Sequence, residues 1–130
     1  MKNVVTPQEI IEQYAKICAV LKETNLTGDY KKGNREFRKG IKIFKILEND
    51  IDLAKQTLPL MFEHENEVVR TKVAAHCLSL KIHIDQAEKI LQDISRDASH
   101  EIFEFAAQMT LDVWRKQGYL KTYKEQQMRK

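Results

Sequence analysis

The second half of the sequence repeats itself with a period of 33 residues. The segments "IDLAKQTL" at 51–58 and "IDQAEKIL" at 84–91 share Ile, Asp, Ala and Leu in one register. Apolar and cap-forming positions correspond over the whole period: Ile51 and Ile84, Asp52 and Asp85, Ala54 and Ala87, Leu58 and Leu91, Met61 and Ile94, Asn66 and Ser99, Val69 and Ile102, Ala74 and Ala107, Leu78 and Leu111. Such periods are typical of stacked repeats, in which a unit buries its apolar face only against a neighbour.

Each repeat unit is predicted to be a pair of antiparallel helices. Asp50 or Asp52, and Asp85, are candidate N-caps of a short first helix, whereas Asn66 and Ser99 are candidate N-caps of a longer second one. The residues that the two copies share are therefore expected to be core and cap positions rather than a binding site.

The N-terminal segment does not follow the repeat register, and we expect it to form a divergent helical hairpin. Its first helix is predicted to begin at "TPQE", where Thr6 and Glu9 can form a capping box around Pro7. In the second helix, at about 30–48, Phe37, Ile41, Phe44 and Leu47 recur at helical spacing as a core face. Gly33 and Gly40 lie on the same side, where they would let a neighbouring helix approach closely.

The predicted fold class is all-α, with a single domain of 130 residues. The chain has 4 Gly and 2 Pro, which leaves little material for turns and favours helices. We expect a stack of about three antiparallel helical hairpins. The predicted parts are a divergent hairpin at 1–50, repeat units at 51–83 and 84–117, and a tail or short helix at 118–130, anchored if Tyr119, Leu120 and Tyr123 pack back.

Two motifs resemble a known family. "HENEVVRTKVAAHCL" resembles the second half of a HEAT repeat, and the run of segments ending in "AAQMTLDVWRKQG", with Met109, Thr110, Leu111 and Trp114, is similar to a small bacterial HEAT-like family of unknown function. The resemblance covers most of the chain. It implies a right-handed HEAT-like stack, a bacterial source and no established catalytic activity, and several small helical-repeat proteins of this kind look like immunity proteins that neutralise toxins.

The sequence favours a cytoplasmic protein with no membrane partner. The N-terminus "MKNVVTPQEI" lacks the apolar segment of a signal peptide, and no apolar run approaches the length of a membrane span. Cys18 and Cys77 sit among apolar neighbours without metal-ligand spacing, so they are predicted to be buried free thiols.

We find no pattern that indicates catalysis, a cofactor or a metal site. The glycines do not form a phosphate-binding loop, and none of the histidines belongs to an HExxH-type arrangement. His64, His83 and His100 are expected at polar turns or exposed helix starts. We therefore predict no enzyme activity and no catalytic residue.

Three polar stripes are candidate partner-binding surfaces. A central edge consists of Lys72 and His76, with Ser79, on a helix that is otherwise apolar; it is predicted to be the solvent-facing edge of that helix or the middle of a contact surface. The basic stripe on the second helix consists of Lys31, Arg35, Arg38, Lys42 and Lys45. The acidic stripe on the last long helix consists of Glu101, Glu104, Gln108 and Asp112, followed by Arg115.

Each charged stripe has more than one interpretation. Both can be solvated helix faces; the acidic stripe can attract a basic partner, and the basic stripe can contact an acidic protein or the phosphates of a nucleic acid. The net charge of +3 is too small to decide for nucleic acid. Our leading hypothesis is a protein-binding module of the immunity type whose partner is a bacterial toxin domain; the alternative is a nucleic-acid-binding protein that uses the basic stripe.

Overall fold

In a computed structural model that describes residues 5–124 and 126, the protein is all-helical, with no strand among these residues. This confirms the predicted all-α class. The elements in chain order are α1 (Pro7–Thr27), α2 (Tyr30–Glu48), α3 (Ile51–Thr57), the 3-10 helix η1 (Leu58–Met61), α4 (Glu67–Leu80), α5 (Ile84–Arg96) and α6 (Glu101–Gln117).

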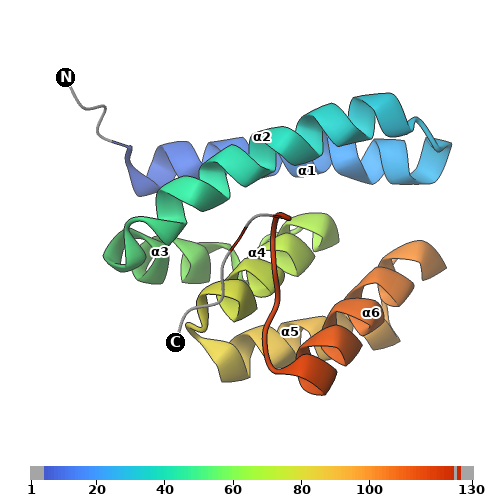
Figure 1. Ribbon diagram of the computed structural model, residues 1–130. Helices are drawn as coiled ribbons and strands as arrows, with labels where there is room; N and C mark the ends of the chain where they lie inside the picture. Colours follow the sequence, from blue (N-terminus) through green and yellow to red (C-terminus); the bar gives the residue numbers. More distant parts are fainter. Residues whose placement is uncertain (1–4, 125, 127–130) are drawn as a thin grey trace.

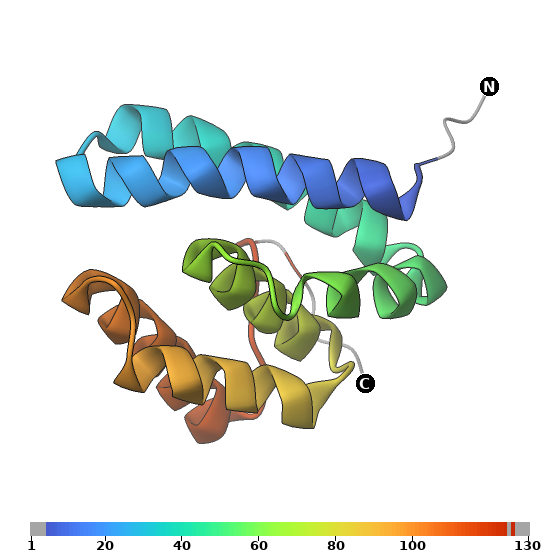
Figure 2. The ribbon, with the colours of Figure 1, turned by 180° about the vertical axis from the view of Figure 1, so that it is seen from behind.

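The helices lie in three layers (Figures 1 and 2). Helices α1 and α2 run antiparallel in the first layer, α3, η1 and α4 form the second, and α5 and α6 form the third. Helix α4 is central, because it packs against α1 on one side and against α5 and α6 on the other. Among the described residues, no helix combines the length and the apolar composition that crossing a membrane requires.

The chain after α6 turns back across the molecule. It leaves α6 at Gly118 and passes over α4 toward α2 (Figure 1). The described part of this tail, 118–124 and 126, contains no helix, so the predicted alternative of a short helix is not seen there. Leu120 and Tyr123 pack against the core, as expected, and the Tyr123 hydroxyl donates a hydrogen bond to Glu48 Oε1 at 2.5 Å. Residues 125 and 127–130 of the predicted tail lie outside the described residues.

Most of the predicted helix caps are present. At α1 the Thr6 side chain accepts from the Glu9 amide, and the Glu9 side chain accepts from the Thr6 amide, which completes the capping box. Asp50 caps α3 and Asn66 caps α4 through side-chain oxygens. These bonds satisfy amides that the first helical turn leaves without a partner.

Two predicted caps are wrong. Asp85 lies within the first turn of α5, and the N-cap position is His83, whose side chain makes no capping bond. Ser99 precedes the N-cap of α6, which is His100. The Ser99 amide and hydroxyl instead donate to Glu67 at 2.8 and 2.5 Å, so this serine joins the α5–α6 connection to α4.

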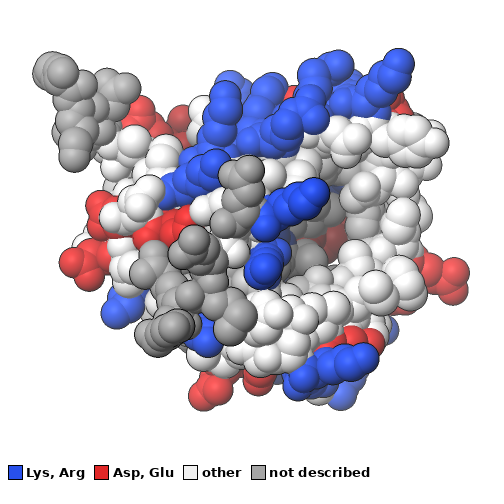
Figure 3. Space-filling view, in the orientation of Figure 1, with Lys and Arg blue, Asp and Glu red and all other residues white. Residues whose placement is uncertain are grey.

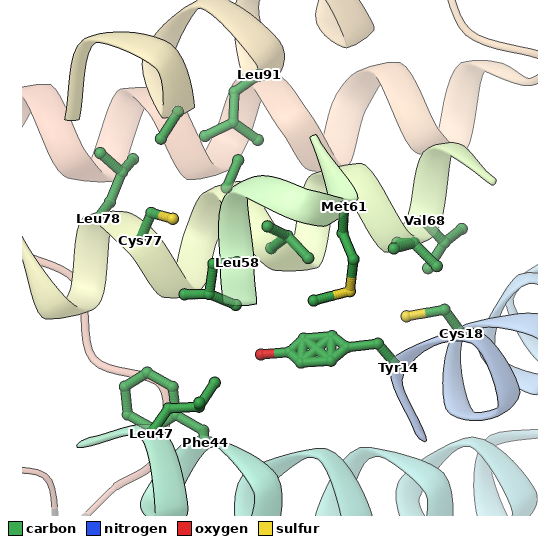
Figure 4. Close-up of a cluster of buried hydrophobic side chains, with 14 of the residues drawn as sticks. Tyr14, Cys18, Phe44, Leu47, Leu58, Met61, Val68, Cys77, Leu78 and Leu91 are labelled. Carbon is green, nitrogen blue, oxygen red and sulfur yellow. The ribbon is translucent and has the colours of Figure 1, made fainter. Parts of the chain in front are cut away.

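The repeat register describes the core well. The matched residues of both units are almost completely buried at five of the pairs: Ala54 and Ala87, Leu58 and Leu91, Met61 and Ile94, Ala74 and Ala107, Leu78 and Leu111. Figure 4 shows Leu58, Leu78 and Leu91 in the same buried cluster as Tyr14, Phe44 and Met61. Cys18 and Cys77 are buried free thiols, as predicted. One pair departs from the pattern: Val69 is fully buried, whereas Ile102 is 44% exposed because α6 is the last helix of the stack.

The core face of α2 is rotated from the predicted one. Phe44 and Leu47 are buried as expected and Ile43 joins them, but Phe37 is 41% exposed. Only one of the two glycines makes a close approach. A Cβ atom on Gly33 would lie 3.0 Å from Thr24 Oγ1 on α1, whereas a Cβ atom on Gly40 would have no atom within 4 Å. The prediction that both glycines serve close packing is therefore wrong for Gly40.

Candidate protein-binding groove

A groove lies between α2, α4 and α6, which belong to the three different layers. It has a volume of about 450 Å³, with α4 as its floor and α6 as one wall. Leu21 and Asn25 near the end of α1, Phe37 of α2 and residues 120–122 of the tail complete it. Its main apolar lining residues are Leu21, Phe37, Phe103, Met109, Val113 and Leu120. Figure 3 shows the hollow in the face over which the tail passes.

Helix α6 presents a row of exposed apolar side chains beside this groove, which we call the apolar stripe. Its members are Ile102 (44% exposed), Phe105 (64%), Met109 (48%) and Val113 (39%), together with the exposed Ala106. The spacing of three and four residues places them on one face of the helix. Three of them, Ala106, Met109 and Val113, also line the groove. The stripe therefore continues the apolar wall of the groove out to the molecular surface.

The central edge lies in the groove, but His76 is not solvent-facing. Lys72, His76 and Ser79 all line the groove, yet His76 is only 3% exposed. Its Nδ1 shares a hydrogen bond of 2.5 Å with the Tyr14 hydroxyl, and its ring lies 4.8 Å from that of Phe44. The prediction of a solvent-facing edge is therefore wrong for this residue, because α1 and α2 cover it.

Lys72 is the cation at the groove floor. Its Nζ lies 4.5 Å from the centroid of the Phe37 ring, a cation–π distance across the gap between α4 and α2. Burial lowers the pKa of Lys72. Burial of His76 is the larger cause, and the nearby Lys72 charge the smaller, that holds the pKa of His76 well below its usual range. This imidazole is therefore neutral. Ser79 Oγ bonds to Thr122 Oγ1 at 2.9 Å, which fastens the tail to α4.

The groove and its border on α2 carry positive charge. The charged residues that line the groove are Lys72 and Lys121. The five members of the basic stripe, Lys31, Arg35, Arg38, Lys42 and Lys45, are all exposed and lie on α2 outside the lining. Figure 3 shows this basic surface along α2, above the hollow. Lys45 also lies over the Tyr123 ring, at 4.8 Å.

The acidic stripe lies outside the groove. Glu101, Gln108 and Asp112 are exposed and Glu104 is half-buried. Glu104 Oε2 accepts a hydrogen bond from the Ala98 amide at 3.0 Å, and Gln108 Nε2 donates to Asp112 Oδ1 at 2.8 Å. Part of this stripe therefore stabilises α6 and the turn before it. The structure does not bring the acidic stripe together with the central edge.

The remaining histidines serve local structure. His64 Nδ1 accepts from the Asn66 amide at 3.0 Å, and His83 Nε2 lies 3.2 Å from the Lys55 carbonyl oxygen. His100 is exposed at the start of α6. Within the described ranges, no group of three or more His, Cys, Asp or Glu residues is placed to hold a metal ion.

Sequence reasoning missed the apolar stripe. The repeat register did predict Ala107 and Leu111 on the buried side of α6. Phe103 is also buried on this side, and Trp114 packs against the core, with its indole Nε1 donating to Glu88 at 2.5 Å. The signal for the stripe was the second apolar row at 102, 105, 109 and 113 on the same helix. A helix that is apolar on two faces indicates a second contact in addition to the core.

Neither a protein-family model, nor a curated protein sequence, nor a solved structure matches this chain at a significant level. The groove and its borders are therefore interpreted from their own chemistry.

Proposed function

We propose that this chain is a non-catalytic protein-binding module of the immunity type, built on a HEAT-like right-handed stack, which neutralises a bacterial toxin domain in the cytoplasm. The apolar stripe of α6 carries the proposal. Four large apolar side chains, Ile102, Phe105, Met109 and Val113, are each more than a third exposed on one helix face. Contiguous apolar surface of this kind, bordered by charge, marks sites of protein contact, since its burial against a partner is favourable.

The arrangement around the stripe supports binding of a macromolecule. The stripe opens into a groove to which α2, α4 and α6 all contribute. Charged residues border it, with the basic stripe on α2 and the acidic stripe on α6. An apolar centre with a charged rim is the usual anatomy of a protein interface, in which the rim orients the partner and accelerates association.

The proposal contains no catalytic step. His76 is the groove residue whose side chain is best suited to act as a general base, but its Nδ1 is hydrogen-bonded to the Tyr14 hydroxyl in the interior. A nucleophile activated by an oriented base requires a different arrangement. Neutralisation by masking a surface of the toxin needs only affinity, and the resemblance to immunity-type helical repeats gives the class of partner.

A pull-down from the source organism's lysate tests the proposal. The bait is the full chain, compared with a Phe105→Ser/Met109→Ser variant and with Leu60→Ser, a control residue that is 63% exposed and outside the groove. We expect one stoichiometric protein to be retained by the wild type and by Leu60→Ser, and to be lost from the double variant. Recovery of nucleic acid alone would overturn the proposal.

The acidic stripe is proposed as a further contact if the toxin is a basic nuclease. Glu101 and Asp112 are the members to reverse, because Glu104 also holds the Ala98 amide. Replacing both by Lys should slow association with a basic partner and reduce its dependence on salt. An unchanged association rate would remove this stripe from the proposal.

The second candidate function is nucleic-acid binding through the basic stripe. The observation that favours it is that all five cationic side chains are exposed in one row along α2. Phosphate binding by such a row predicts that affinity falls steeply with salt. Fluorescence anisotropy with labelled duplex and single-stranded DNA and RNA, at several salt concentrations, tests this function, and Arg35→Glu/Lys42→Glu should abolish binding if it is correct.

A further inference from the structure

The apolar stripe has the length and form of a receptor for a helix. From Ile102 to Val113 it spans twelve residues of α6, whose eleven steps correspond to about 16 Å at the rise of an α-helix. This is roughly three helical turns. A flexible or compact ligand would contact only the groove. The apolar surface continues beyond the groove, because Phe105 is 64% exposed and lies outside its lining.

The opposite side of the groove is also apolar. Phe37 of α2 and Leu21 of α1 line it, facing the α6 wall formed by Met109 and Val113. A helix lying between these walls would bury apolar residues at i, i+3, i+4 and i+7, which is the ordinary pattern of helix-in-groove recognition.

The charge inside the groove indicates what else such a helix carries. Lys72 at the floor and Lys121 at the tail are the charged lining residues, and within the described part of the chain Lys72 forms no ion pair. Its ammonium group is partly withdrawn from water and rests against Phe37. A carboxylate brought to this position would replace lost hydration with a charge-assisted hydrogen bond.

We propose that the groove binds an amphipathic helix of about three turns from the partner protein, with its apolar face on the α6 stripe and one carboxylate paired with Lys72. This inference rests on the proposed function and names the chemistry of the partner segment. The basic stripe on the neighbouring face of α2 favours further acidic residues on the outer side of that helix.

The test is a selection from a displayed library of 16-residue peptides. The library has a helical framework of Ala, Glu, Lys and Gln, and every amino acid is allowed at positions i, i+3, i+4, i+7, i+8 and i+11. The full-length wild-type chain is the target. We expect enrichment of Leu, Ile, Phe or Met at most of these positions and of Asp or Glu at one. Labelled peptides are then titrated by fluorescence anisotropy, and helix formation is followed by circular dichroism.

Matched variants locate the bound peptide. Lys72→Gln should weaken the selected peptides by roughly 30-fold or more, the effect of removing one partner of a buried charge pair. Lys42→Gln, which removes an exposed lysine of the basic stripe, should change the affinity by less than about threefold. Phe105→Ser should weaken binding without touching the groove floor, which keeps the test valid if Lys72→Gln alters the fold.

Several outcomes would overturn the inference. They are a selection that yields no binding peptide, enriched peptides with no acidic position, and affinities that Lys72→Gln and Phe105→Ser leave unchanged. Because the selection uses no natural partner, its failure is separable from that of the proposed function. A toxin that the wild type and Lys72→Gln capture equally, and that the Phe105→Ser/Met109→Ser variant loses, would leave the proposed function standing and this inference wrong.

Discussion

The Tyr14 hydroxyl and Nδ1 of His76 lie 2.5 Å apart, joining α1 to α4 in the interior of the protein. Both side chains are buried, at 3% exposure, and their rings meet edge to face with centroids 5.6 Å apart. Burial raises the pKa of Tyr14, so the hydroxyl keeps its proton. This bond fixes the N-terminal hairpin on the central helix below the groove.

Removing the hydroxyl should destabilise the fold. Tyr14→Phe leaves Nδ1 of His76 buried without its partner, which costs about 1–3 kcal/mol. Urea denaturation followed by circular dichroism measures the change. Tyr30→Phe is the matched control, because Tyr30 is 78% exposed, and it should leave the midpoint unchanged. Equal midpoints for the two variants would show that the Tyr14 bond contributes nothing.

The neutral state of His76 predicts a dependence of stability on pH. Its folded pKa lies well below the unfolded value of about 6.5, so the unfolded chain binds the extra proton as pH falls. The stability is complete above pH 6.5 and is lost below it, by at most about 1.4 kcal/mol per pH unit. Unfolding free energies at pH 7.5, 6.5, 5.5 and 5 measure this loss.

Two variants assign the pH effect. His76→Gln should be less stable at neutral pH but should lose most of the dependence between pH 6.5 and 5. His100→Gln removes an exposed histidine and should keep the wild-type slope. If His76→Gln and the wild type have the same slope, the proton is bound elsewhere.

Glu67 should contribute through its hydrogen bonds as well as its charge. Its carboxylate accepts from the Ser99 amide and hydroxyl and pairs with Lys22 Nζ at 3.1 Å, so it connects α4 to α1 and to the α5–α6 turn. Burial alone would raise the pKa of Glu67, but the bonds from Ser99 and Lys22 outweigh it and lower the pKa. This contribution is present above the unfolded pKa and is lost as pH falls through the lower folded value.

Replacement of this carboxylate by an amide tests its contribution. Glu67→Gln should destabilise by about 1–3 kcal/mol at pH 7, since it loses charge-assisted bonds and leaves donors unsatisfied. Glu65→Gln, at an exposed position in the preceding turn, is the control. The difference should shrink as the pH is lowered from 7 to 3, because the contribution of the charged carboxylate falls once the unfolded chain begins to bind its proton. A difference that persists unchanged would exclude the charge as its source.

The two glycines of α2 should respond differently to alanine. Gly40→Ala places a methyl group in open space and should stabilise the helix by about 0.5–1 kcal/mol. At Gly33 the same methyl lies 3.0 Å from Thr24 Oγ1, which bonds to the Leu21 carbonyl, so the gain should be smaller or reversed. Thermal unfolding of both variants measures this, and an equal rise in Tm would show that Thr24 yields without cost.

The sequence predicted the buried half of the molecule better than the exposed half. The repeat register is an internal comparison, and residues such as Leu58 and Leu91 must be apolar in both units to fill the same space. The sequence contains no comparable internal signal for whether another helix covers a polar helix face. His76 has polar neighbours at helical spacing, and only the crossing of α1 and α2 over α4 shows that it is enclosed. The groove likewise depends on where the helices separate, which local patterns do not encode.

Val69 and Ile102 give the sharpest test of whether the apolar stripe is surface or core, because they occupy the same register position in successive units. Val69 is fully buried, and Val69→Ala should cost about 2 kcal/mol through lost apolar burial and the cavity left behind. Ile102 is 44% exposed in the apolar stripe, so Ile102→Ala should change the free energy of unfolding by less than about 0.5 kcal/mol. Denaturation measures both values. If the stripe is the partner surface, Ile102→Ala should nevertheless weaken binding. Substitution would then affect stability at Val69 and affinity at Ile102, the matched positions of the two units. A large loss of stability in Ile102→Ala would instead make this side of α6 part of the core.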